Sequence, residues 1–138
     1  MKLQVYSDGA SRGNPGVSAI AYMILDEETR MLRRYSSYLG VRTNNQAEYE
    51  ALLAALQSAS EFDYDEVECY LDSELVVKQL NGQYKVRNDN LKALWLQIQK
   101  YKQRFSKISF TYVPRTNSQI QEVDRLANLA LDRIKNRL

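Results

Sequence analysis

Four acidic residues, spread along the chain, have the type and placement that catalytic chemistry would need. Asp8 and Asp72 each follow a run of alternating apolar residues, at the point where a strand is expected to end. Glu48 lies in the first turn of a predicted helix, on its apolar stripe, and Asp124 lies in the first turns of the last predicted helix, in line with its apolar residues. If the two strands are parallel neighbours, the four carboxylates meet at one edge of a sheet.

Such a cluster of carboxylates predicts a site for divalent metal ions. Like charges at close range repel each other unless a cation neutralises them, and ligands that are all oxygen favour Mg²⁺ or Mn²⁺. Two such ions about 3.5–4 Å apart would clamp the attacking water and the leaving oxygen of a phosphodiester. The chain has no histidine and one cysteine, Cys69. This excludes catalytic triads with histidine, an internal disulfide, and zinc sites built from histidine or several cysteines.

Each acid also has a simpler interpretation. Asp72, which precedes Ser73, could cap a helix, and Asp8 could be a turn residue. Glu48 could stabilise a helix dipole, and Asp124 could form a surface ion pair with Arg125. The four acids therefore make a site only if the fold brings them together.

The apolar pattern predicts a mixed sheet that would do so. Alternation predicts five strands, over residues 2–8, 17–25, 31–39, 67–71 and 108–113. Helical periodicity predicts helices that start at Thr43 or Asn44 and run to residue 60, and over residues 72–80, 90–105 and 119–138. This order predicts an α/β fold with a five-stranded mixed sheet, three antiparallel strands followed by parallel strands, and helices on both faces. The first and fourth strands are expected to be parallel and central.

Length and composition limit the class of protein. The chain has 138 residues, which is the size of one domain, and we expect a single domain over residues 1–138. With 44% hydrophobic and 26% charged residues, the composition is globular and argues against disorder. No apolar run approaches the roughly 20 residues that span a bilayer, and the N-terminus lacks the apolar stretch of a signal peptide. We therefore expect no membrane association, a cytoplasmic location, a monomer, and no obligate protein partner.

The charge is unevenly distributed, although the net charge is only +2. Residues 76–107 contain eight basic residues and one acid, together with several aromatic residues. The segment is either a solvated helix face or a surface that binds a polyanion such as nucleic acid. Within it, Trp95 falls on the apolar stripe and is assigned to the core. Tyr84, beside Lys85 in a predicted loop, is better placed to contact a ligand.

Four short segments resemble the sequence motifs of the type 1 ribonuclease H family (ribonuclease HI), within the ribonuclease H-like superfamily. The segment SDGASRGNPG at residues 7–16 is similar to the first motif of that family, and TNNQAEY at residues 43–49 is similar to the second. YLDS at residues 70–73 and DRLAN at residues 124–128 resemble the third and fourth. The motifs occur in the family's order, and the predicted elements agree with its fold over nearly the whole chain.

The resemblance implies a metal-dependent endonuclease that hydrolyses the RNA strand of RNA–DNA hybrids and leaves 5′-phosphate and 3′-hydroxyl ends. It assigns the catalytic and metal-ligating roles to Asp8, Glu48, Asp72 and Asp124, with two Mg²⁺ ions per site and Mn²⁺ as an alternative ion. It also assigns contacts with the hybrid to a second set of residues: Asn14, Thr43, Asn44, Asn45, Gln46, Tyr84 and Lys85. The amides in this set can read 2′-hydroxyls and base edges in the minor groove, and Thr43 would hold a phosphate of the DNA strand.

The sequence departs from the family pattern in three places. Many relatives carry a histidine in the loop before the last helix, where this chain has none, and Arg115 or Asn117 is the candidate to replace it. Ile120 and Val123 stand where the family often has Asn and Ala. Residues 81–90 are too few for the extended basic protrusion of some relatives.

Two alternatives remain open at this stage. One is a nucleic-acid-binding module of the same fold without catalysis, and the other is a related nuclease that cuts DNA. The run of amides at residues 44–46 favours reading of 2′-hydroxyls and therefore RNA.

Overall fold

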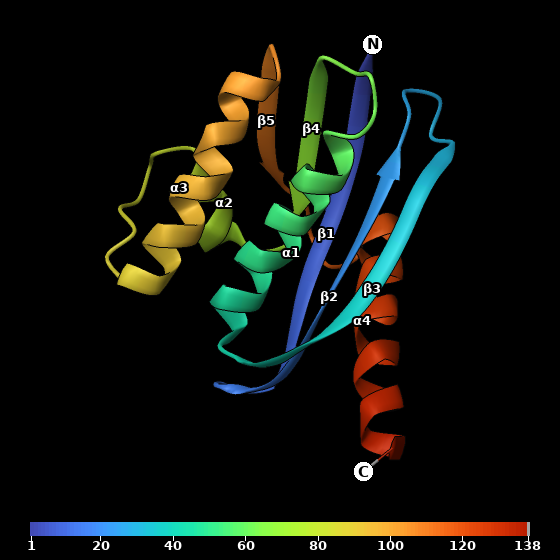
Figure 1. Cartoon of the computed structure of the whole chain (residues 1–138), viewed down its shortest axis with the longest axis vertical. Coiled ribbons are helices and arrows are strands. Elements are labelled where there is room, and N and C mark those ends of the chain that lie inside the picture. Colours follow the sequence, from blue (N-terminus) through green and yellow to red (C-terminus); the bar gives the residue numbers. More distant parts are fainter. Residues whose placement is uncertain (138) are drawn as a thin grey trace.

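The computed structural model describes residues 1–137 and contains one five-stranded sheet with helices on both sides (Figure 1). The strands are β1 (Lys2–Gly13), β2 (Gly16–Leu25), β3 (Met31–Arg42), β4 (Glu66–Leu71) and β5 (Lys107–Tyr112). The helices are α1 (Asn44–Ala59), α2 (Glu74–Leu80), α3 (Asp89–Arg104) and α4 (Ser118–Arg137). The number, type and order of these elements agree with those predicted from the sequence.

The sheet has the strand order β3-β2-β1-β4-β5. Strands β1, β2 and β3 are joined by short turns and pair antiparallel, whereas β4 pairs parallel with both β1 and β5. Because a parallel connection needs a crossover, α1 links β3 to β4, and α2 and α3 link β4 to β5. The predicted mixed sheet, with the first and fourth strands parallel and adjacent, is confirmed.

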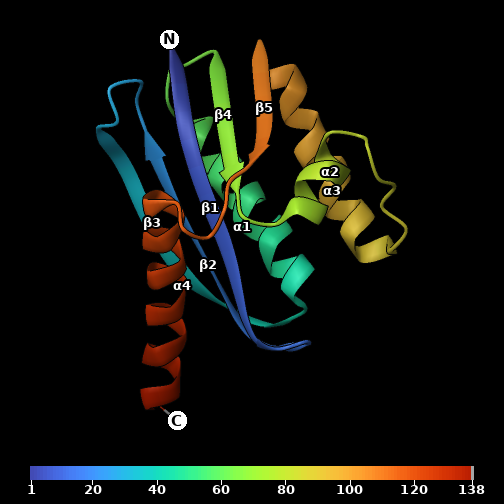
Figure 2. The ribbon, with the colours of Figure 1, turned by 180° about the vertical axis from the view of Figure 1, so that it is seen from behind.

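The alternation of the strands gives the sheet two apolar faces. Side chains such as Val5 and Ile24 contribute to a core that also contains residues of α1 and α3, and Met23 contributes to a second core with α4. Seen from behind, α4 lies alone on its side of the sheet (Figure 2). Helices on both faces are therefore also confirmed.

Several boundaries differ from the prediction because strand pairing and caps decide them. Strand β1 continues past Asp8 to Gly13, since its ladder with β2 runs on to the Gly13–Gly16 pair. The predicted turn at residues 11–16 is thus a hairpin tip with strand on either side. Helix α3 begins at Asp89 because the side chain of Asn88 accepts a hydrogen bond from the Leu91 N–H. The last residue of the predicted final helix, at position 138, lies outside the described residues.

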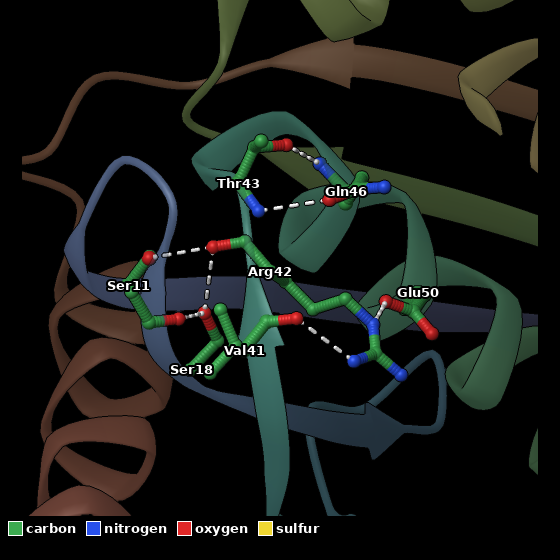
Figure 3. Close-up of polar contacts among 8 residues, drawn as sticks. Ser11, Ser18, Val41, Arg42, Thr43, Gln46 and Glu50 are labelled. Atoms are coloured by element: carbon green, nitrogen blue, oxygen red, sulfur yellow. Dashed lines mark hydrogen bonds and ion pairs between the residues drawn. The ribbon is translucent and has the colours of Figure 1, made fainter. Parts of the chain in front are cut away.

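A set of polar contacts fixes the junction between β3 and α1 (Figure 3). Thr43 caps α1 through its hydroxyl, which accepts from the Gln46 N–H, while the Gln46 side chain accepts from the Thr43 N–H. The carbonyl of Arg42 accepts from the hydroxyls of Ser11 and Ser18 at 3.1 and 3.3 Å. The first turn of α1 is thereby tied to the ends of β1 and β2.

Among residues 1–137, none of the helices combines the length and the apolar character that a membrane span requires.

Candidate active site

The parallel pairing of β1 and β4 places Asp8 and Asp72 next to each other. The last parallel pair is Tyr6 with Tyr70, and each acid lies two residues further along its strand direction. Asp72 follows the end of β4, whereas Asp8 lies within β1, beyond the part that pairs with β4. The predicted meeting of these two acids at one edge is observed. Ser73, and not Asp72, caps α2, so the capping interpretation of Asp72 is wrong.

Gly9 allows the third acid to reach the same point. A Cβ atom on Gly9 would lie 2.2 Å from the backbone carbon of Ala47, so only glycine lets α1 pack this closely against β1. The N–H of Gly9 donates to Oε1 of Glu48 at 2.9 Å. Glu48 is buried, as its position on the apolar stripe predicted, and its hydrogen bond is to the strand and not to its own helix.

Asp8, Glu48 and Asp72 form a compact carboxylate cluster. One oxygen from each lies within 4.8 Å of the others. Asp8 and Glu48 are 4% and 7% exposed, and the cluster lies in a pocket of about 600 Å³. These oxygens are close enough to share a single cation.

The surroundings of the cluster disfavour negative charge. Burial raises the pKa of the Asp8 carboxyl far above its ordinary value, and the charge of Glu48 raises it further. Burial also raises the pKa of Glu48. The pKa of Asp72 is raised by desolvation, although the guanidinium of Arg115 acts in the opposite direction. In the absence of a cation, Asp8 and Glu48 therefore retain a proton between them at neutral pH.

The residues present fit a divalent metal ion. All the donors are carboxylate oxygens, which hard cations prefer. Oε2 of Glu48 is buried and has no hydrogen-bond partner, which is costly for a polar atom unless a ligand satisfies it. A cation would supply that partner and would relieve the repulsion that raises the pKa values of the cluster.

Asp124 lies at the rim of this pocket and outside the compact cluster. It lies one helical turn after Ile120, and both residues line the pocket; the side chain of Asp124 is exposed, whereas Ile120 and Leu131 are buried. Arg125 pairs with Glu122, so the expected alternative, an ion pair between Asp124 and Arg125, is not observed.

The two candidates for the missing histidine have different environments. Arg115 lines the pocket, is largely exposed, and places Nε 3.7 Å from Oδ2 of Asp72. The side-chain oxygen of Asn117 accepts from the N–H groups of Gln119 and Ile120 and so caps the start of α4. Arg115 is therefore the candidate that faces the acids, and Asn117 has a structural role.

The amides of the first two motifs meet beside the pocket. Oδ1 of Asn14 accepts from the Asn44 N–H at 3.0 Å, which joins the β1–β2 hairpin tip to the start of α1. Asn44 and Asn45 both line the pocket. Thr43 and Gln46 use one side-chain oxygen each in the capping box, so both residues have a structural role at the start of α1.

Tyr84 and Lys85 lie away from the acids, in a separate hollow of about 390 Å³ between α2 and α3. Tyr84 is half exposed, and the ammonium of Lys78 lies 5.1 Å from the centre of its ring. Trp95 packs against the core and donates from Nε1 to the Gln79 carbonyl at 3.0 Å, in agreement with its assignment to the core.

The pocket contains further polar residues that the sequence interpretation did not select: Ser11, Ser73, Gln121 and Asn128. Asn128 is part of the fourth motif and lies one helical turn after Asp124. The i, i+4 spacing was a signal that could have identified it.

An acidic pocket at the edge of a mixed sheet, where parallel strands end, defines a domain of the ribonuclease H type. Residues 6–130 match the model of a family described as reverse transcriptase-like. The chain is 38% identical over 131 residues to ribonuclease HI of Halobacterium salinarum, covering 95% of this chain and 65% of the relative. It is 36% identical to a bifunctional protein of Mycobacterium tuberculosis and spans 36% of its length. The chain belongs to the ribonuclease H-like family.

Solved structures agree with this assignment. RNase H1 of H. salinarum superimposes with a TM-score of 0.90 at 37% identity and covers 96% of this chain and 98% of its own. The N-terminal RNase H domain of the M. tuberculosis protein gives 0.92 at 34% identity, with 99% and 97% covered. LC11-RNase H1, isolated from compost, has been solved in complex with an RNA/DNA hybrid and gives 0.88 at 36% identity, with 96% and 98% covered.

Proposed function

We propose that this chain is an endoribonuclease that hydrolyses the RNA strand of RNA–DNA hybrids with the help of divalent metal ions. The observation that carries this proposal is the cluster of Asp8, Glu48 and Asp72 in a pocket lined by amides. The likeness to a structure that contains an RNA/DNA hybrid supports the substrate class. The proposed products are a 5′-phosphate and a 3′-hydroxyl, the ends formed when water attacks phosphorus and the 3′ oxygen leaves.

Asp8, Glu48, Asp72 and Asp124 would hold the ions, which are proposed to be two Mg²⁺, or Mn²⁺ in their place. Bound ions activate water and neutralise the charge that develops on the phosphate. The chain's own contribution is to fix these carboxylates: Asp8 and Glu48 are buried, and the Gly9 N–H holds one oxygen of Glu48. Because their positions are set before substrate binds, little reorganisation is required during the reaction.

The amides beside the pocket are proposed to recognise the substrate. Asn44 and Asn45 line the pocket, and Asn14 is fixed against Asn44. Amides both donate and accept, so they can bind the 2′-hydroxyls that distinguish RNA from DNA. Thr43 and Gln46 would contribute the groups that the capping box leaves free. Tyr84 and Lys85 are proposed to contact the hybrid away from the cut.

Arg115 is proposed to take the place of the loop histidine. Its guanidinium lies beside Asp72 and is exposed, so it can move between that carboxylate and a phosphate without disturbing the core. An arginine cannot transfer a proton at neutral pH, so its role would be electrostatic.

A substrate panel tests this function. The purified chain is incubated with Mg²⁺ or Mn²⁺ and labelled RNA–DNA hybrid, duplex DNA or duplex RNA, and the ends of the products are mapped. We expect cleavage of the RNA strand of the hybrid. Asp8→Asn and Asp72→Asn should each lower the rate at least about 100-fold with the fold intact, whereas the exposed control Asp63→Asn should not. Hybrid binding without turnover, or full activity of Asp8→Asn, would contradict the proposal.

A further inference from the structure

Asp124 differs from the other acids at the pocket because its side chain is exposed on α4. Asp8 and Glu48 are buried, and packing restricts their side chains. An exposed side chain on a helix samples several rotamers unless another group holds it. The carboxylate of Asp124 faces Asp8 in the pocket, but packing does not fix it, so its position depends on the groups that hold it on α4.

Asn128, one turn further along α4, supplies that partner. Its side-chain Nδ2 lies 3.3 Å from Oδ1 of Asp124 and 3.0 Å from the Asp124 carbonyl oxygen. An amide nitrogen carries two N–H groups, so it can donate to both oxygens at once. Residues four apart share one face of a helix, which places Asn128 at the same pocket.

Arg12, on β1, determines which way the Asn128 amide points. Its Nη2 lies 3.4 Å from both Oδ1 and the carbonyl oxygen of Asn128, and 2.6 Å from Oδ1 of Asp132. Arginine only donates, so the amide oxygen must face Arg12 and the amide nitrogen must face Asp124. The ion pair with Asp132 in turn anchors the guanidinium to α4.

We propose that Asn128 is a positioning residue that, oriented by Arg12, holds the carboxylate of Asp124 in place to ligate a divalent cation. The inference rests on the proposed function, because it takes Asp124 as a metal ligand. It adds a link between the hairpin of β1 and β2 and the one ligand that comes from the opposite side of the sheet from Glu48.

Metal titration tests the role of Asn128 without using catalysis. Mg²⁺ binding to the full chain is measured by calorimetry for the wild type, Asn128→Ala and the exposed control Arg133→Ala, which is on the same helix. Asn128→Ala should weaken Mg²⁺ binding about 3- to 10-fold, toward the lower end of what partners of metal ligands contribute. Its rate should fall at limiting Mg²⁺ and recover at high Mg²⁺, with KM for the hybrid unchanged. Arg133→Ala should match the wild type.

A double variant shows whether Asn128 acts through Asp124. In the Asp124→Asn background, Asn128→Ala should cause no further loss of Mg²⁺ affinity, because the carboxylate that it positions is gone. Unchanged Mg²⁺ affinity in Asn128→Ala, or losses that simply add in the double variant, would overturn the inference while the proposed function stands. A wild type that neither binds Mg²⁺ nor cleaves hybrid would instead refute the proposed function.

Discussion

At the scale of single residues, the carboxylate cluster is unfavourable for the metal-free fold. Asp8 and Glu48 are buried beside each other and beside Asp72, and their raised pKa values express the cost of their charges. The metal-free protein is therefore less stable than it would be without these charges, and the same residues form the place that a cation can occupy. This cost can be measured through its dependence on pH and on metal.

We expect Asp8→Asn to stabilise the metal-free protein at high pH. The folded pKa of Asp8 is raised above its unfolded value of about 4, so the folded state holds the proton more tightly and wild-type stability falls as pH rises above that value. The variant lacks this dependence. In EDTA, its free energy of unfolding should exceed that of the wild type by about 1–2 kcal/mol at pH 8 and by less at pH 5.

Urea unfolding at the two pH values, with and without Mg²⁺, measures this difference. Mg²⁺ should stabilise the wild type and leave Asp8→Asn nearly unchanged. A variant that is less stable than the wild type in EDTA at pH 8 would show that the cluster does not carry the expected repulsion.

Gly9→Ala should damage both the fold and the site. The added Cβ would meet the backbone of Ala47, which cannot move without shifting α1. We expect a loss of about 2–4 kcal/mol in the free energy of unfolding and a large loss of Mg²⁺ affinity. Gly82→Ala is the matched control: its Cβ has open space, and its φ of 78° costs only about 1 kcal/mol. Equal losses in the free energy of unfolding of the two variants would contradict the close packing of α1 against β1.

At the scale of elements, Asp26 organises the turn between β2 and β3. Its carboxylate accepts from the N–H groups of Glu28 and Arg30, and Nε of Arg30 lies 2.8 Å from Oδ2. The Arg30 N–H contributes most to lowering the pKa of Asp26. The charged carboxylate thus stabilises the hairpin.

The contribution of Asp26 should depend on pH in the opposite sense to that of Asp8. A lowered folded pKa gives stability that is present above the unfolded pKa of about 4 and is lost as pH falls through the folded pKa. Asp26→Asn should therefore unfold at a lower temperature than the wild type at pH 7, and this difference in melting temperature should narrow toward pH 3. Thermal unfolding scans between pH 7 and pH 3 measure the difference. Glu28→Gln, at an exposed residue of the same turn, should have nearly the melting temperature of the wild type at any pH.

Apolar periodicity was sufficient to predict the elements and their order. Leu3 and Val5, or Val67 and Cys69, alternate so regularly that the strands and their buried face could be read directly. The end of β1 could not be predicted in this way, because the pairing of Arg12 with Val17 is a contact between strands that overrides the local turn composition. Strand ends depend on partners, and partners are not visible in a local window of sequence.

The residues of the candidate site also divide into those that the sequence pattern predicted and those that it did not. Asp8, Glu48 and Asp72 were predicted to meet because strand order and helix periodicity fix where they point. Asp124 was expected at the same point; it lines the pocket but is not one of the three acids in the compact cluster. The i, i+4 spacing from Asp124 could have placed Asn128 at the pocket, but its orientation by Arg12 could not be predicted, because Arg12 is distant in sequence.

At the scale of the whole molecule, the two parts of the proposed binding surface are separate. The acids lie in one pocket, and Tyr84 and Lys85 lie in another hollow beside α2 and α3. The segment of residues 76–107, with eight basic residues and one acid, contributes the exposed face of α3. A duplex that reaches both sites would be held by phosphate contacts at the hollow of Tyr84 and Lys85 and cut at the acidic pocket.

Lys92 of α3 lines the same hollow as Lys85. We therefore expect Lys85→Ala and Lys92→Ala to affect binding more than chemistry. Each should raise KM for the hybrid several-fold with kcat nearly unchanged, and should reduce the slope of log affinity against log salt by about 1. Lys135→Ala is the matched control, since Lys135 is near the C-terminal end of α4, far from α3 in both views (Figures 1 and 2). A fall in kcat without a change in KM would contradict a role in binding.

The position of α4 has a consequence for how activity begins during synthesis. It follows the other elements described here, and it brings Asp124 and Asn128 to a pocket whose other acids come from β1, from α1 and from the residue after β4. A ribosome that has made only residues 1–117 has produced the sheet and three carboxylates but lacks the fourth. On the proposed mechanism, a nascent chain cannot degrade nucleic acid near the ribosome until translation has passed α4 and that helix has docked.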